Sequence, residues 1–374
     1  MKKTLAAVAV LGAFAGSALA ADVTLYGKVD LGVRYVHSDE GGDKSDTWGL
    51  KSGGSSSSRW GLKGSEQISE GLTVGFQLES GFNADDGDDQ EDKLFRRESR
   101  LYVATDYGTL HMGRFGALDS ATGSVDMAAG MSAAGTGYGD YIANQGLVMH
   151  TNSRLNNSIA YTSPEFAGIK IAAMASLGDD KSETKYPFVD KDGNLSTSEK
   201  YDGTPVGTKP ETTKLGSEGS SDVDRYYALG AKGQWGALGA GVIVSTEDFA
   251  NHTEDNSMNV TAGVNYDFGV AKVFLAANYY DTGVKNEDAW GTVVSVAAPV
   301  AGGSMEVSAG YGVETAVEKN KEVDTDKMFV GGFYKYPLSK RTYVYTAAGY
   351  YQEEPDGGDK NKYVEAMTGI CHNF

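Results

Sequence analysis

The stretch VTLYGKVDLGVRY, residues 23–35, decides the fold class because two kinds of residue alternate strictly along it. The mostly apolar parity is Val23, Leu25, Gly27, Val29, Leu31, Val33 and Tyr35, and the more polar parity is Thr24, Tyr26, Lys28, Asp30, Gly32 and Arg34. Successive side chains of a β-strand point to opposite faces, so this pattern predicts a strand with one apolar and one water-facing side. The run exceeds the about 5–6 residues of an ordinary soluble strand and suffices for the about 9–11 of a tilted membrane-crossing strand.

The same alternation recurs along the chain. SRWGLKGSEQ (58–67) and LTVGFQLESGF (72–82) both show it, and only the short turn 69–71 separates them. Connections on the other side are long and polar: 39–57, 83–93, 178–224, 246–256, 281–288, 314–326 and 353–361. Tight turns on one side and long loops on the other are typical of outer-membrane barrels. We therefore expect an all-β fold, a transmembrane antiparallel β-barrel of about 16 strands over residues 21–374.

Composition agrees with a barrel and excludes other classes. Among 374 residues, 50 are Gly and 22 are Tyr, and the mean hydropathy is -0.36. No apolar run reaches the roughly 20 residues of a membrane-spanning helix, whereas a barrel exposes only alternate residues to lipid. The formal net charge of -18 argues against nucleic acid as a partner, because nucleic-acid binding requires a basic surface.

The first 20 residues have the three parts of a secretory signal. Lys2 and Lys3 precede an apolar core from Leu5 to Ala15, and Ala18-Leu19-Ala20 supplies small residues at a cleavage site. We expect residues 1–20 to be removed on export, which leaves the barrel domain 21–374.

A long Gly-, Ala- and Met-rich segment interrupts the alternating pattern at residues 116–149. TLHMGRF before it and NSIAYTS after it both have strand periodicity. A connection of this length within a compact domain is usually functional. We expect it to fold inward and to narrow the hole that the wall encloses.

Five stretches resemble the general diffusion porins of the neisserial and betaproteobacterial type. They are SRWGLKGSEQISEGLTVGFQLESGF (58–82), DYGTLHMGR (106–114), NSIAYTSPEFAGIKI (157–171), YPLSKRTYVY (336–345) and the C-terminal ICHNF (370–374). The resemblance covers the chain apart from its external loops and the 116–149 segment. It implies a 16-stranded, trimeric barrel in the outer membrane of a Gram-negative bacterium, whose third external loop, here 116–149, folds into the lumen and forms the constriction. Two departures stand out: Cys371 replaces a usually basic residue, and the 178–224 loop is unusually long.

Charged side chains on the water-facing parity are the candidates for the pore. An arginine facing lipid costs about 2–4 kcal/mol at the bilayer midplane, so strand arginines should turn inward, where opposed charges select ions. The predicted constriction residues are Arg34, Arg59, Arg96, Arg100, Asp119, Asp126 and Asp140, with Lys28 and Glu79 on the pore wall. Arg114 has lipid-facing parity unless its strand is bulged. The terminal Phe374 resembles the aromatic signal read by the barrel-assembly machinery.

Other chemistry is weakly supported. The five histidines have no metal-ligand spacing, and we expect no catalytic site and no cofactor. Residues 190–194 open like a calcium loop, but Leu195 stands where its turn glycine belongs. The acidic run 85–92 could bind divalent cations or contact a neighbouring subunit, although such runs are usually just solvated. Cys371 is expected to be a small wall residue.

These features predict an outer-membrane porin, a water-filled channel for passive diffusion of ions and small hydrophilic solutes, and not an enzyme. Expected partners are two further copies of the chain in a homotrimer, outer-membrane lipids and lipopolysaccharide. Two alternatives stay open: a substrate-specific channel with aromatic residues such as Tyr26, Tyr102 and Tyr138 in the lumen, and a surface adhesin or structural barrel acting through 178–224. The sequence leaves anion against cation preference undecided.

Overall fold

A computed structural model of the chain describes residues 23–374 except 90–92, 179–180, 190–194, 199–203, 206–210, 217–222, 250–254 and 319–320. The predicted signal sequence 1–20 and the calcium-like segment 190–194 lie outside the described residues.

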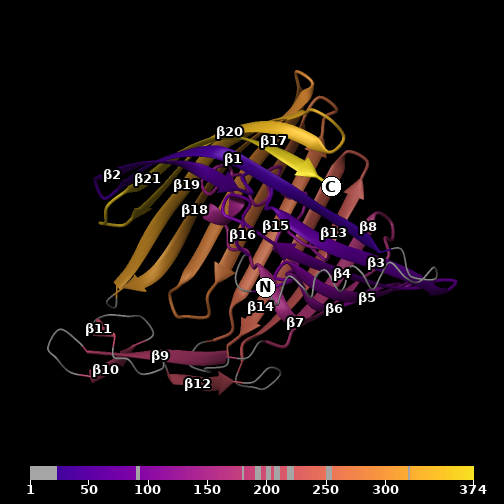
Figure 1. Cartoon of the computed structure of the whole chain (residues 1–374), viewed down its shortest axis with the longest axis horizontal. Coiled ribbons are helices and arrows are strands. Elements are labelled where there is room, and N and C mark those ends of the chain that lie inside the picture. The colour runs from indigo at the N-terminus through magenta and orange to yellow at the C-terminus, as the bar shows by residue number, and fades with distance from the viewer. Residues whose placement is uncertain are drawn as a thin grey trace.

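The chain forms a closed antiparallel β-barrel (Figure 1). Seventeen strands make up its sheet, but β2 and β3 lie one after the other on the same side of β1, so the wall has 16 strand positions. This confirms the expected fold class. The strands are β1 Thr24–Glu40, β2 Asp43–Ser52, β3 Arg59–Ser69, β4 Leu72–Gly81, β5 Glu98–Thr105, β6 Gly108–Gly116, β7 Arg154–Thr162, β8 Ile169–Ser176, β13 Arg225–Trp235, β14 Leu238–Asp248, β15 Met258–Asp267, β16 Lys272–Asp281, β17 Asp288–Val300, β18 Gly303–Glu318, β19 Lys321–Pro337, β20 Thr342–Pro355 and β21 Asn361–Asn373.

The pairings β1–β21 and β8–β13 complete the ring. β1 pairs with β21 from Lys28 opposite Asn373 to Glu40 opposite Asn361. β8 pairs with β13 across the long insertion, with Lys170 directly opposite Lys232. Closure matters because every wall strand then has a neighbour on each side, and a barrel without free edges is one of the two ways a backbone can cross lipid.

The segment between β2 and β3 is fixed to β1 by Asp30. Its fully buried carboxylate accepts hydrogen bonds from the backbone N–H groups of Ser55 and Ser56 at 3.0 and 2.8 Å, and from the Tyr345 hydroxyl at 2.7 Å. Gly53 has a φ of 71°, a conformation that glycine adopts without strain. The chain therefore leaves the wall at residues 53–58 and rejoins it at Arg59.

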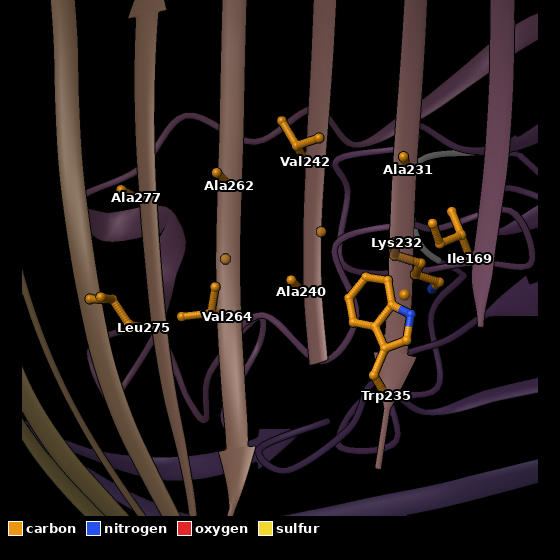
Figure 2. Close-up of a pocket in the computed structure, with 13 residues that line it drawn as sticks. Ile169, Ala231, Lys232, Trp235, Ala240, Val242, Ala262, Val264, Leu275 and Ala277 are labelled. Atoms are coloured by element: carbon orange, nitrogen blue, oxygen red, sulfur yellow. The ribbon is translucent and has the colours of Figure 1, made fainter. Parts of the chain in front are cut away.

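The two faces of the wall differ as the alternation predicts. Leu25, Val29 and Val33 of β1 are exposed, whereas Asp30 is buried on the opposite face. Figure 2 shows the apolar outer face over β13–β16, where Val242, Val264 and Leu275 stand among alanines and glycines around a shallow groove of about 480 Å³. We call this exposed outer surface the apolar belt.

A second, small sheet lies beyond the barrel strands (Figure 1). It consists of β9 Lys181–Val189, β10 Leu195–Ser198, β11 Thr204–Pro205 and β12 Glu211–Gly216, all within the predicted 178–224 loop. Among the described residues, no helix is long and apolar enough to cross a bilayer.

Candidate pore and constriction site

The predicted 116–149 loop, which joins β6 to β7, is a packed unit. Its apolar side chains are almost fully buried, among them Leu118, Met127, Met131, Ile142 and Val148, although loops normally lie on a surface. Glycines of the wall make room for them on the face opposite the apolar belt. A Cβ at Gly241 or Gly263 would lie 2.7 Å from Met131, and one at Gly349 would lie 2.9 Å from Ile142. The packing of the loop against the wall thus requires glycines at these positions of the strands.

Asp119 anchors the first part of the loop. Its side chain is 1% exposed and accepts hydrogen bonds from the Tyr226 hydroxyl, the Asn259 amide at 2.7 Å and the Ser245 hydroxyl. The Asn152 amide, beyond the loop, donates a further bond at 3.2 Å. These donors are neutral, so Asp119 fixes the loop to β13–β15, and the structure does not bring it to an arginine of the predicted set.

Tyr138 anchors the middle of the loop on β18 and β19. Its ring stacks on Phe333 with centroids 3.7 Å apart and planes 7° apart, and its hydroxyl donates to the Glu306 carboxylate. Next to it, Tyr141 stacks on Tyr363 of β21 with centroids 4.3 Å apart. Both rings stack on aromatic residues of the wall, so Tyr138 is a packing residue of the loop.

Asp140 and Arg34 join the loop to β1 and β21. Asp140 pairs with Arg34 at 2.6 Å and with Lys51 at 2.8 Å. Arg34 also pairs at 2.6 Å with the fully buried Glu365, which in addition accepts the backbone N–H groups of Asp140 and Tyr141 at 2.9 and 2.7 Å. Desolvation acts to raise the pKa of the Asp140 carboxyl, but Lys51 and Arg34 outweigh it and hold the pKa below its ordinary value. We call this group the Arg34–Asp140–Glu365 clamp.

Asp126 faces a different cation. Its carboxylate accepts the backbone N–H groups of Ala128 and Ala129, while Lys232 donates to its backbone carbonyl at 3.0 Å. Burial raises the pKa of the Asp126 carboxyl to about 6, despite the opposing effects of these hydrogen bonds and of Lys232. Among the three loop aspartates, Asp140 is the one paired with an arginine in the described part of the chain.

A polar cavity of about 620 Å³ lies between the loop and β1, β3, β4, β5 and β7. Four basic side chains line it, from Lys28, Arg59, Arg97 and Arg154, against the two carboxylates of Glu79 and Glu98; the loop contributes residues 121–124 and 136. Glu79 is paired with Arg97 at 2.6 Å and lies 3.8 Å from Arg59. The cavity therefore has more positive than negative charge, and we call it the arginine cavity.

Other predicted residues lie outside this cavity. Arg100 points away from the apolar belt but is only 8% exposed, and it bonds to His111 at 2.7 Å, Gln77 at 3.0 Å and Glu98 at 3.3 Å. Arg96 precedes β5, and its backbone carbonyl accepts a bond from Arg114 at 2.7 Å. The β6–β7 register shifts between Gly113 and Phe115, so the bulge that would free Arg114 from lipid-facing parity is present.

Two arginines of the cavity were missed by the parity argument. Arg97 immediately precedes β5, so strand alternation does not apply to it. Arg154 begins β7 next to the same register shift, where Asn157 has a φ of 48°. The available signal was the adjacent pair Arg96 and Arg97, but alternation places only one of two adjacent residues on the water-facing side, and the prediction chose Arg96.

The C-terminal residue completes a contact with β1. The backbone groups of Phe374 and Gly27 exchange two hydrogen bonds of 3.0 Å, and the Phe374 side chain is exposed on the same outer face as Ile370. Cys371 has the opposite orientation and is fully buried in the wall.

Comparison with known proteins agrees with this architecture. Residues 6–356 match the family described as Gram-negative porin. The chain belongs to this family.

The chain is thus an outer-membrane channel for passive diffusion in a Gram-negative bacterium, and porins are channels, not enzymes. It is 28% identical to an outer membrane porin protein of Bordetella pertussis, over the whole of both chains. It is 29% identical to Outer membrane porin protein 32 of Delftia acidovorans, over 92% of this chain and 88% of the relative. Major outer membrane protein P.IB of Neisseria meningitidis is 27% identical over both full lengths.

Solved structures share the fold at lower identity. The anion-selective porin from Comamonas acidovorans superposes with a TM-score of 0.62 at 22% identity, covering 95% of this chain and all of the other. OmpT of Vibrio cholerae, in its trimer form, gives a TM-score of 0.59 at 15% identity with the same coverage.

Proposed function

We propose that the 116–149 loop folds into the lumen and sets the size limit of the channel. The observation that carries this proposal is the set of loop anchors. Asp119, Tyr138 and Asp140 reach strands from β1 through β13 to β21, always on the face opposite the apolar belt. A segment that contacts separate parts of a closed wall on that face has to cross the enclosed space.

Charge selection is proposed to take place in the arginine cavity. Lys28, Arg59, Arg97 and Arg154 outnumber Glu79 and Glu98 there, so the local field favours anions. Arg34 and Asp140 neutralise each other in the clamp and contribute less. The acidic loops predicted to be external oppose this preference, but salt screens solvent-exposed charges beyond about 8–10 Å.

A homotrimer is the proposed assembly. OmpT, which shares the fold, has been solved in a trimer form. Leu94, Leu101 and Ile68 provide exposed apolar side chains at β3 to β5, where Trp60 packs edge-on against Phe95. We further propose that the rest of the apolar belt contacts outer-membrane lipid and lipopolysaccharide, and that Phe374 is read by the barrel-assembly machinery.

The decisive experiment is reconstitution of the purified chain in a planar bilayer. We expect large conductance steps that close in thirds, and a reversal potential in a salt gradient whose sign indicates anion preference. Cation preference would refute the role of the arginine cavity while leaving the channel intact. Silence from correctly folded protein would refute the open pore and favour a substrate-specific channel or a structural barrel.

A further inference from the structure

A second cavity lies at the short-turn end of the barrel, away from the arginine cavity. It has a volume of about 570 Å³ and lies between loop residues 127–131 and the wall strands β5–β8 and β13–β16. Three lysines from different strands line it, Lys170, Lys232 and Lys272, with Glu165 as the single carboxylate in the lining. We call it the lysine cavity.

The arrangement of two of these lysines is electrostatically unfavourable. Lys170 and Lys232 are directly opposite one another in the β8–β13 pair, so their side chains leave the same face side by side. Like charges directly opposite on neighbouring strands destabilise a sheet. Lys170 is exposed and forms no ion pair within the described part of the chain. The loop offers Lys232 the backbone carbonyl of Asp126 and, nearby, the negative charge of its carboxylate, which together relieve part of the repulsion.

The remaining lining supplies hydrogen-bonding groups. Gln234 and Asn265 lie one row nearer the turns, on either side of Gly239, whose missing side chain leaves room for both amides. Lys272 approaches from β16, where its ammonium group lies 5.2 Å from the centre of the Phe274 ring. Thr162 and Ser163 complete the polar side of the lining.

We propose that the lysine cavity binds a doubly charged oxyanion, a phosphate group that is either free or carried by a small solute. Three ammonium groups around one cavity suit a dianion because lysine acts as a mobile point charge with three donors. The proposal extends the proposed channel function, since the site receives anions that have already passed the loop. Its position makes it a second binding step on the periplasmic side.

The test is block of KCl current through single channels by inorganic phosphate and by glucose 6-phosphate, at about pH 8. Lys170→Gln and Lys272→Gln are compared with the control Lys63→Gln. Lys63 is also exposed, on β3, and lies over the Tyr26 ring, but it does not line the lysine cavity. The first two variants should weaken block by about 3- to 10-fold, and the control by less than about twofold.

The outcomes separate this proposal from the channel itself. Block by inorganic phosphate alone would restrict the site to the free ion, and block by glucose 6-phosphate alone would restrict it to a carried phosphate. Normal conductance with equal block in all three variants, or with no block, would overturn the site and leave the pore standing. A wild-type protein that does not conduct would overturn the pore and the site together.

Discussion

Glu365→Gln tests whether the clamp holds the loop in place. The carboxylate accepts three hydrogen bonds, from Arg34 at 2.6 Å and from the backbone of Asp140 and Tyr141 at 2.9 and 2.7 Å. Glutamine has a single acceptor oxygen, so its NH2 group would face either Arg34 or the two backbone donors, and each bond that is lost or made to a neutral acceptor costs about 1 kcal/mol. The substitution should therefore weaken docking by about 3 kcal/mol, which raises the undocked population about 100-fold.

Single-channel recording detects the undocked loop population as a change in the current. We expect Glu365→Gln to add current noise and brief conductance changes, and amide hydrogen exchange at residues 138–142 to accelerate. Gly139→Ala should act in the same way, because its Cβ would lie 2.2 Å from Glu365 and its φ of 60° disfavours alanine. Glu353→Gln is the matched control, since Glu353 bonds to Tyr351 and Asn361 of the wall. A Glu365→Gln channel as quiet as the control, with unchanged exchange, would refute the clamp.

Three further predictions concern the other anchors and the cavity. Asp119→Ala leaves the buried Tyr226 hydroxyl and Asn259 amide without their acceptor, at about 1–3 kcal/mol each, so hydrogen exchange at residues 117–128 should accelerate; unchanged exchange would contradict the anchor. Arg154→Gln should shift the reversal potential toward cations, whereas Arg341→Gln in an exposed turn should not; equal shifts would argue against the arginine cavity. Burial raises the pKa of the Asp126 carboxyl to about 6, so docking of the loop should weaken as pH rises from about 4 to 6. Burial also lowers the pKa of His150, which weakens docking below about pH 6.5 and acts in the opposite direction. Current noise is therefore compared between wild type and Asp126→Asn at pH 5 and 7, and identical pH profiles would exclude a role for Asp126.

The wall could be predicted from the sequence because a period of two is imposed residue by residue. Leu25, Val29 and Val33 face outward and Asp30 faces the other way, as their alternation requires. The strand count followed from the same signal. The prediction of a loop over 39–57 was wrong for β2, but β2 and β3 share one wall position, so the count was unaffected.

Details of the candidate site were less accessible to sequence reasoning. Alternation does not apply where a strand begins or bulges, and Arg97 and Arg154 lie at such points. Partners distant in sequence, such as Glu365 for Asp140, cannot be inferred from spacing along the chain. Asp119 resembles a pore-lining aspartate in sequence, and only its buried neutral donors identify it as an anchor.

The anchors of the 116–149 loop have a consequence for engineering and for evolution. Each one packs against particular residues of the wall: Tyr138 requires Phe333, Ile142 requires Gly349, and Met131 requires the glycines of β14 and β15. A loop transplanted from another porin would face wall residues that fit the side chains of this loop and not its own. Pore size should therefore be exchanged between relatives only when loop and wall change together, so recombination at the loop boundaries alone should yield poorly closed channels.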